Sequence, residues 1–167
     1  MDRILVIGSP GAGKTTFSLA LAARLSLPVV HLDRLFWRDG WQSVSREEFD
    51  RQLAEAMDAP AWIIDGNYSR TLPVRLAAAD TVIWLRYPTV TCLTGVLCRV
   101  IRNRGKSRPD MGGNCPERLD GEFLRYVCGF RKTQQPKMQA LLAKAQDKRI
   151  VVLKSRRAAE KFLKTLP

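Results

Sequence analysis

The stretch Gly8-Ser9-Pro10-Gly11-Ala12-Gly13-Lys14-Thr15-Thr16 matches the pattern G-x-x-x-x-G-K-[ST] of phosphate-binding loops. A short apolar run precedes it at residues 3–7 and is typical of a buried strand. Residues 16–25 follow, with apolar side chains at helical spacing. The order of strand, glycine-rich turn and helix is the one that a phosphate-binding loop requires. A glycine-rich turn that matched the pattern by chance would not be expected to have a strand before it and a helix after it.

The residue types of this loop indicate its chemistry. The three glycines allow positive φ angles and let the backbone approach a ligand closely. The N–H groups of the loop can then point at an anion, at the positive end of the following helix. We expect Lys14 to reach the β- and γ-phosphates of ATP, the Thr15 hydroxyl to bind Mg²⁺, and Thr16 to contact the α-phosphate.

Length and composition exclude several classes of protein. The 167 residues suit a single domain spanning 1–167, and no run of 18 apolar residues predicts a membrane span. The first residues enter a strand without a signal-peptide pattern, so we expect a cytoplasmic protein. The four cysteines, at 92, 98, 115 and 128, form no C-x-x-C pair and are expected to be reduced thiols.

The charge of the chain is unevenly distributed. Residues 1–98 hold 10 Lys/Arg and 10 Asp/Glu, whereas residues 99–167 hold 18 Lys/Arg and 6 Asp/Glu. The whole net charge of +12 therefore belongs to the C-terminal part. A polyanion such as nucleic acid is one explanation. The other is a set of phosphate-facing arginines on a solvated basic surface.

The rest of the chain alternates between strand and helix patterns. After residues 3–7, strands are expected at 28–33, 61–65, 80–86 and 149–153, with an aromatic-rich loop at 34–41. Helices are expected at 46–57, 71–79, 89–103, 121–131, 136–145 and 156–166, the first opened by a capping box at Ser45. This order predicts an α/β protein of the P-loop NTPase fold, with a five-stranded parallel sheet and helices on both faces.

Two acids end neighbouring strands, where ligands of such sheets bind. Asp65 stands where the acid that holds Mg²⁺ through water is usually found, although a helix cap or turn residue is the alternative. Asp33 could accept the proton of a substrate hydroxyl, or could instead pair with Arg34 or another arginine. Trp37 and Trp41 follow Asp33 and could wall an acceptor pocket, although core packing is the more common role.

A polar stretch rich in glycine and proline, residues 104–120, predicts a lid-like loop. Four arginines surround it: Arg99, Arg102, Arg104 and Arg108. Arginines stabilise the charge that develops in phosphoryl transfer, so at least two are expected to bind phosphate. The alternative is an exposed basic helix end. We expect the loop to be mobile until a triphosphate binds, unless Met111, Cys115 and Leu119 pin it to the body.

These runs together resemble the adenylate-kinase-like P-loop kinases. The P-loop, Asp65-Gly66 and the arginine-rich insertion carry that resemblance. His31-Leu32-Asp33, Phe36-Trp37, Gly40-Trp41 and Ile64-Asp65-Gly66-Asn67-Tyr68 look closer still to the DNA topology modulation (FlaR-type) proteins. The resemblance implies binding of ATP or GTP and a nucleoside-kinase-like fold with a short lid, and the acceptor-side insertion at 34–60 is also short. We expect the acceptor to lie near Asp33, Arg70 and Arg75. Arg70 is offset by one residue from the arginine of adenylate kinases.

Three functions are compatible with these features. The first is a kinase that transfers the γ-phosphate of ATP to a nucleotide or another small molecule. The second is a nucleotide-dependent DNA-binding or regulatory protein, supported by the basic C-terminal part although no helix-turn-helix or zinc-finger pattern is present. The third is an ATP-binding protein without turnover.

Overall fold

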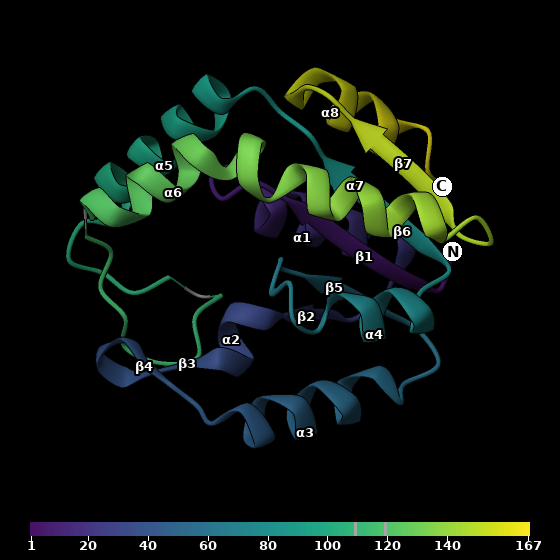
Figure 1. Cartoon of the computed structure of the whole chain (residues 1–167), viewed down its shortest axis with the longest axis horizontal. Helices are drawn as coiled ribbons and strands as arrows, with labels where there is room; N and C mark the ends of the chain where they lie inside the picture. Colours follow the sequence, from purple (N-terminus) through teal and green to yellow (C-terminus); the bar gives the residue numbers. More distant parts are fainter. Residues whose placement is uncertain (109, 119) are drawn as a thin grey trace.

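A central parallel sheet organises the chain, in a computed structural model that describes residues 1–108, 110–118 and 120–167. Its order is β2-β5-β1-β6-β7, and every pairing is parallel (Figure 1). The strands are β1 (Arg3–Gly8), β2 (Val29–His31), β5 (Trp62–Asp65), β6 (Thr81–Leu85) and β7 (Arg149–Leu153). The predicted five-stranded parallel sheet is therefore confirmed, and β1, which carries the P-loop, is its central strand.

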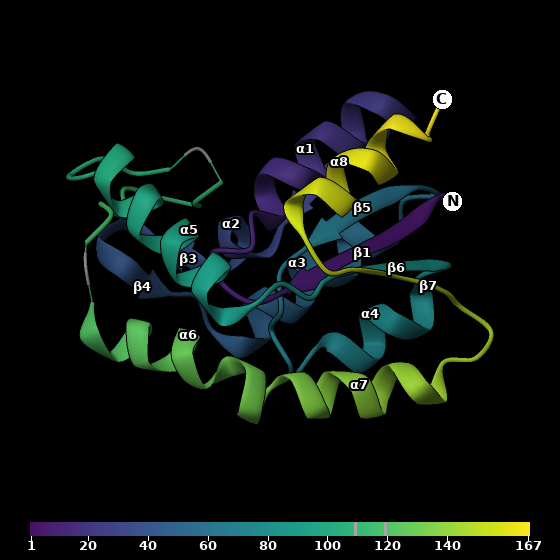
Figure 2. The same cartoon turned by 90° about the horizontal axis from the view of Figure 1, so that it is seen from above.

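Helices cover both faces of the sheet, as predicted (Figure 2). The helices are α1 (Lys14–Leu25), α2 (Leu32–Phe36), α3 (Arg46–Met57), α4 (Leu72–Ala78), α5 (Thr89–Arg102), α6 (Gly121–Thr133), α7 (Gln135–Lys144) and α8 (Arg156–Lys164). One face packs against α3, α4 and α7, and the other against α1, α5 and α8. Helix α6 contributes to both faces, through Phe130 on the first and Val127 on the second.

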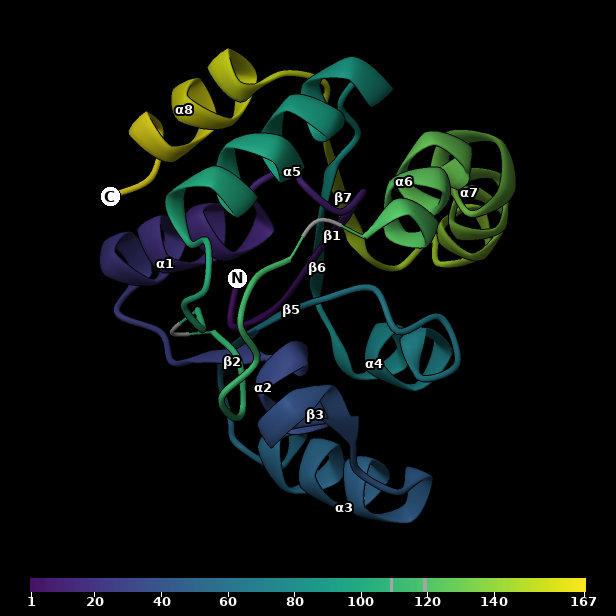
Figure 3. The ribbon, with the colours of Figure 1, turned by 90° about the vertical axis from the view of Figure 1, so that its left-hand side faces the viewer.

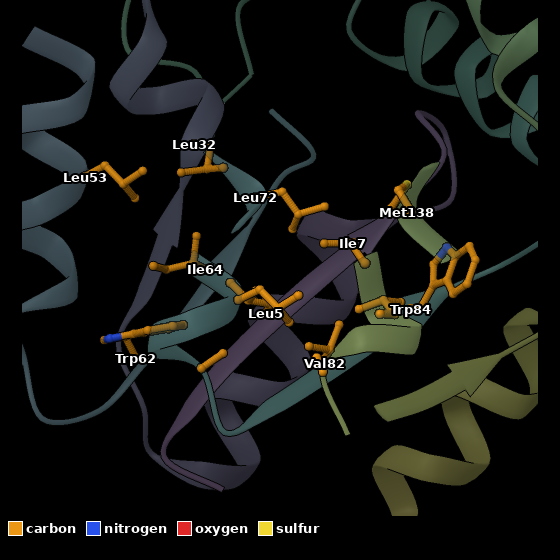
Figure 4. Close-up of a cluster of buried hydrophobic side chains, with 14 of the residues drawn as sticks. Leu5, Ile7, Leu32, Leu53, Trp62, Ile64, Leu72, Val82, Trp84 and Met138 are labelled. Atoms are coloured by element: carbon orange, nitrogen blue, oxygen red, sulfur yellow. The ribbon is translucent and has the colours of Figure 1, made fainter. Parts of the chain in front are cut away.

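The two cores follow from the alternation of side chains along β1. Leu5 and Ile7 belong to the α3–α4–α7 side, together with Trp62 and Trp84, as Figure 4 shows. Ile4 and Val6 point to the α1–α5–α8 side. These four residues of β1 are completely buried, as is usual for a parallel sheet covered on both faces. Both strand tryptophans, Trp62 and Trp84, are therefore core residues.

The segment after β2 differs from the prediction. Strand β2 ends at His31, so Asp33 lies in the short helix α2 rather than at a strand end. The expected aromatic loop is instead a small hairpin: β3 (Trp37–Arg38), the 3₁₀ turn η1 (Asp39–Trp41) and β4 (Gln42–Ser43). Gly40 has a φ of 67°, a backbone conformation that glycine adopts without steric cost, and this allows the chain to make the tight turn. Strands of two residues are too short to give a recognisable alternation in the sequence.

The predicted lid-like loop is folded over its described residues. Ser107 accepts a hydrogen bond from Cys115 N–H and donates one to Gly113 O, which closes the loop on itself. Met111 is 6% exposed and Cys115 is fully buried, so these two residues anchor the loop to the body, as the alternative prediction stated. Pro109 and Leu119 lie outside the described residues.

Within the described ranges, no helix is long and apolar enough to cross a membrane.

Candidate functional site

The P-loop lies between β1 and α1 with its backbone open to the cavity. Gly11 and Gly13 have φ angles of 78° and 85°, which L side chains rarely adopt. A Cβ atom on Gly11 would lie 2.1 Å from the carbonyl oxygen of Cys92, so only glycine fits there. Helix α1 begins at Lys14 without a side-chain cap, and its first-turn N–H groups therefore remain free for an anion.

Lys14 curls back over the loop. Its Nζ donates to the carbonyl oxygens of Gly8 at 3.0 Å and Ser9 at 3.3 Å. Burial lowers the pKa of Lys14, and the carboxylates of Asp33 and Asp65 oppose that shift. Within the described residues this ammonium group donates hydrogen bonds to neutral carbonyl oxygens, and charged phosphate oxygens would be stronger acceptors. This arrangement fits the role predicted for Lys14.

Asp65 and Thr15 fit a magnesium ion. The Asp65 side chain is 7% exposed, and its Oδ1 lies 3.0 Å from His31 Nδ1. Its other oxygen, Oδ2, is buried and has no hydrogen-bond partner within the described part of the chain. Thr15 Oγ1 donates to Asp110 Oδ2 at 3.0 Å. Carboxylate and hydroxyl oxygens are the ligands that Mg²⁺ prefers, and an orphaned buried oxygen is well suited to a metal-bound water.

Asp33 is fixed by two neighbours. Tyr68 Oη donates to Asp33 Oδ1 at 2.8 Å, and Arg108 Nη2 lies 3.8 Å from Asp33 Oδ2. Burial and the Asp33 carboxylate raise the pKa of Tyr68, so the phenol keeps its proton and donates it. The side chain of Asp33 is 41% exposed and lines the cavity. Asp33 therefore pairs with an arginine, as the alternative hypothesis stated, and stays accessible from the cavity, while its role as a proton acceptor stays a prediction.

Two of the predicted arginines share one buried acid. Glu117 Oε1 lies 3.1 Å from Arg99 Nε and 2.7 Å from Arg108 Nε, and its side chain is 2% exposed. Arg108 also pairs with Asp110 at 3.0 Å. Burial, and then the neighbouring Arg108, lower the pKa of Arg99. The lid therefore carries its own counter-charges, Asp110 and Glu117. Neither acid was predicted as a site residue, because each stands alone in a stretch whose arginines are more prominent.

The other predicted arginines separate. Arg102 lines the cavity, whereas Arg104 is exposed and does not. Arg70 pairs with Asp50 at 2.6 Å outside the cavity. Arg75 is fully buried and donates to the carbonyl oxygens of Gly66, Asn67 and Tyr68. The structure does not bring Arg70, Arg75 or Arg104 to the site, and Arg75 instead supports the turn that carries Tyr68.

The lid is fastened to the hairpin that follows α2. Asn114 N–H donates to Asp39 Oδ1, Gly40 N–H donates to Asn114 O at 2.9 Å, and Trp41 Nε1 donates to Pro116 O at 3.2 Å. A Cβ atom on Gly112 would lie 2.2 Å from the carbonyl oxygen of Arg34, so the two backbones are in close contact. We call residues 37–43 together with the described residues of 104–118 the lid–hairpin unit.

One cavity of about 1360 Å³ brings together the P-loop, the two predicted acids and three of the predicted arginines. Small-molecule pockets usually measure roughly 300–1000 Å³, so this volume suits two ligands better than one. Its walls come from the P-loop, α5, α6, α8 and the lid–hairpin unit. Figure 3 shows how these elements are arranged. The predicted residues on these walls are Pro10, Gly11, Ala12, Gly13, Lys14, Thr15, Thr16, Asp33, Asp65, Arg99, Arg102 and Arg108.

Comparison with known proteins supports the fold. No protein-family model matches the chain, and no curated protein sequence matches it. Among solved structures, shikimate kinase from Bacteroides thetaiotaomicron aligns with a TM-score of 0.57 and 17% identity, over 98% of this chain and 95% of that one. Shikimate kinase from Acinetobacter baumannii in complex with shikimate gives the same score and identity, over 99% and 90%. The chain thus has the P-loop NTPase fold of these enzymes.

Proposed function

We propose that the chain is a P-loop kinase that transfers the γ-phosphoryl group of ATP to a hydroxyl of a small molecule. One observation carries the proposal: Lys14, Thr15, Asp65 and Asp33 converge on a single cavity beside paired arginines. A P-loop alone would indicate only nucleotide binding. The carboxylate of Asp33, reachable from the same cavity, adds a group that can accept a proton from an acceptor.

The residues divide the reaction between them. The N–H groups of Gly11 and of residues 13–16, together with the Lys14 ammonium group, hold the triphosphate, while Thr15 and Asp65 would hold Mg²⁺, which neutralises phosphate charge when bound. Asp33 takes the proton of the acceptor hydroxyl, whose oxygen bonds to the γ-phosphorus as the bond to the β–γ bridging oxygen breaks. ADP and a phosphate monoester leave.

The arginines stabilise the transferred group. Arg99 and Arg108 stand beside the cavity with their charge balanced by Glu117, and Arg102 joins them from the last turn of α5. Negative charge spreads over the equatorial oxygens of the phosphoryl group during transfer. Guanidinium groups already held in place by an acid need little reorganisation to meet that charge.

Two finer parts of this proposal come from resemblance. The similarity of the 31–41 and 64–68 runs to DNA topology modulation proteins supports a place among kinase-like members of that group. The shikimate bound to one structural neighbour supports a small-molecule acceptor here. Nucleic-acid binding, the alternative function, is supported only by the net charge of residues 99–167, and two of the arginines there, Arg99 and Arg108, are engaged by Glu117 and Asp110 rather than free for a polyanion.

Acceptor-dependent release of ADP tests the proposal. A panel of nucleosides, nucleoside monophosphates and small hydroxylated metabolites is incubated with ATP and Mg²⁺, and a DNA shift assay is run at two salt concentrations. We expect release of ADP with at least one acceptor, abolished in the Asp33→Asn variant. ATP binding without turnover for any acceptor, combined with salt-sensitive DNA binding, would support the alternative.

A further inference from the structure

The arginine beside Asp33 is already paired with other carboxylates, so it is poorly placed to bind a negatively charged acceptor. Among the described residues, Arg108 is the one cation within 4 Å of Asp33, and it also pairs with Asp110 and Glu117. Arg70 is held by Asp50, and Arg75 is buried under the 66–68 turn. A carboxylate or phosphate on the acceptor would meet Asp33, Asp110 and Glu117 with no unengaged guanidinium beside Asp33 to balance them.

The remaining cations of the cavity lie elsewhere. Arg156 is the first residue of α8. A Cβ atom added to Gly95 would lie 3.3 Å from Arg156 Nη2 and 2.1 Å from the carbonyl oxygen of Gly11, so this guanidinium lies close to the P-loop. Arg102 lies two turns beyond Gly95 in α5. Arg118 is exposed on the lid. All three line the cavity, but within the described residues none of them lies within 4 Å of an Asp33 carboxylate oxygen.

The walls around Asp33 are aromatic. Trp37 and Trp41 pack edge to face with ring centres 5.4 Å apart. Phe36 lies between Trp37 and Tyr68, at 4.9 Å and 5.1 Å. Helix α6 contributes Phe123 and Tyr126 to the lining of the same cavity. Tyr126 is 42% exposed, which a core residue would not be.

Two of these aromatic residues have a strained backbone. Trp41 has a φ of 64° and Tyr68 a φ of 30°, both in the left-handed region. Bulky residues are outliers there, and such strain gathers at functional sites, where the rest of the fold overcomes it. Both strained residues line the same cavity, and Tyr68 touches Asp33 directly. The strain therefore supports a functional placement of these rings.

We infer that the acceptor is an uncharged hydroxyl compound with a flat ring, such as a nucleoside, bound between the aromatic rings of the hairpin and α6. This inference rests on the proposed phosphotransferase function. The ring stacks on the aromatic wall, which recognises any flat π-face. The hydroxyl points at Asp33, which takes its proton as the oxygen bonds to the γ-phosphorus of ATP. Shikimate-like and nucleoside-monophosphate acceptors are disfavoured by their charge.

Matched acceptors test the charge requirement. Each ribonucleoside is compared with its 5′-monophosphate, and shikimate with its uncharged methyl ester, in the ADP-release assay with ATP and Mg²⁺. Ribose serves as the acceptor without a flat ring. We expect at least one nucleoside to give a rate about tenfold above its monophosphate and above ribose, because its base stacks on the aromatic wall without bringing a charge to Asp33. A monophosphate or shikimate that outpaces its uncharged counterpart overturns the inference and leaves the kinase proposal standing.

Binding measurements separate the two failures. Trp37 and Trp41 are partly exposed in the cavity, whereas Trp62 and Trp84 are buried, so nucleoside binding should quench mainly the first pair. Quenching without ADP release from any acceptor supports the aromatic site and overturns the kinase proposal. Calorimetric binding of ATP without quenching by any ring compound overturns the inference alone.

Variants then locate the ring. Tyr126→Ala, at an exposed position, and Trp41→Ala should each weaken nucleoside binding about tenfold by calorimetry. Trp41→Phe keeps a ring and should retain most of the affinity. Val74→Ala, at a side chain 60% exposed on α4 and outside the cavity, is the matched control. Unchanged binding in both Tyr126→Ala and Trp41→Ala would overturn the proposed aromatic site.

Discussion

The P-loop and the lid–hairpin unit form opposite walls of one cavity, but they are specified in different ways. The P-loop is nine consecutive residues between one strand and one helix. The lid–hairpin unit is joined by hydrogen bonds between residues 75 positions apart, from Asn114 to Asp39 and from Trp41 to Pro116. A local motif can be recognised from its spacing, whereas a unit built from distant segments depends on contacts that no single stretch reveals.

The largest expected effect belongs to the locally specified wall. Lys14→Ala should leave the fold intact and weaken binding of ATP with Mg²⁺ roughly 100-fold, because charge-assisted contacts to phosphate contribute about 1.5–3 kcal/mol each. Calorimetric titration measures the loss, and circular dichroism checks the fold. A folded variant with unchanged affinity would mean that the P-loop does not hold the triphosphate as described.

Asp65→Asn should reduce turnover about 10- to 100-fold with a smaller change in ATP affinity. The carboxylate acts on the metal-bound water, so its charge matters most when the phosphoryl group carries most negative charge. Steady-state kinetics at several Mg²⁺ concentrations measure both parameters. A raised Michaelis constant with a normal turnover number would exclude the metal role. Normal values for both would leave Asp65 as the structural partner of His31.

Glu117→Gln tests whether the lid is assembled by its own acids. The neutral amide cannot balance two guanidinium groups in a buried position, so we expect a loss of about 2 kcal/mol in the free energy of unfolding. A non-hydrolysable ATP analogue should recover more stability in this variant than in the wild type, because phosphate supplies the missing negative charge. Urea unfolding with and without the analogue measures both. Glu122→Gln, at an exposed acid of α6, is the control.

The same contrast explains what the sequence could predict. The sheet and the P-loop follow from apolar runs and a nine-residue motif, and the strand at Arg149–Leu153 has the bounds that its apolar residues predict. Asp110 and Tyr68 were missed because each acts on a partner 95 or 35 residues away, Thr15 and Asp33 respectively. Arg75 was predicted to bind the acceptor, but it is buried and supports the 66–68 turn. A sequence does not distinguish an arginine that supports a turn from one that binds a ligand.

Gly112→Ala should loosen the lid from the hairpin without touching the P-loop. The added methyl group would lie within 2.3 Å of the carbonyl oxygens of Arg34 and Trp37, which cannot move as a flexible side chain would. We expect a loss of about 1–2 kcal/mol in stability and faster amide exchange over 110–116. Gly129→Ala is the matched control, because its added Cβ meets nothing within 4 Å and its helix favours alanine. Equal exchange in both variants would show that the docking is unimportant.

The smallest expected effect concerns the lid in the free protein, where sequence and structure predict opposite results. Repulsion among Arg104, Lys106 and Arg108 predicts a mobile lid that ATP orders. The contacts predict a lid that is already closed in the free protein. Glu117 and Asp110 balance the charge of Arg108, and two hydrogen bonds join the lid to the hairpin, from Asn114 N–H to Asp39 and from Trp41 Nε1 to the carbonyl oxygen of Pro116. A ligand shifts a population only as far as its affinities for the two states differ, so a lid already closed has little left to gain. We therefore expect hydrogen exchange across 110–116 to slow by less than about threefold when the ATP analogue binds. Slowing of tenfold or more there, with the β1 amides unchanged, would show instead that the lid opens in the free protein.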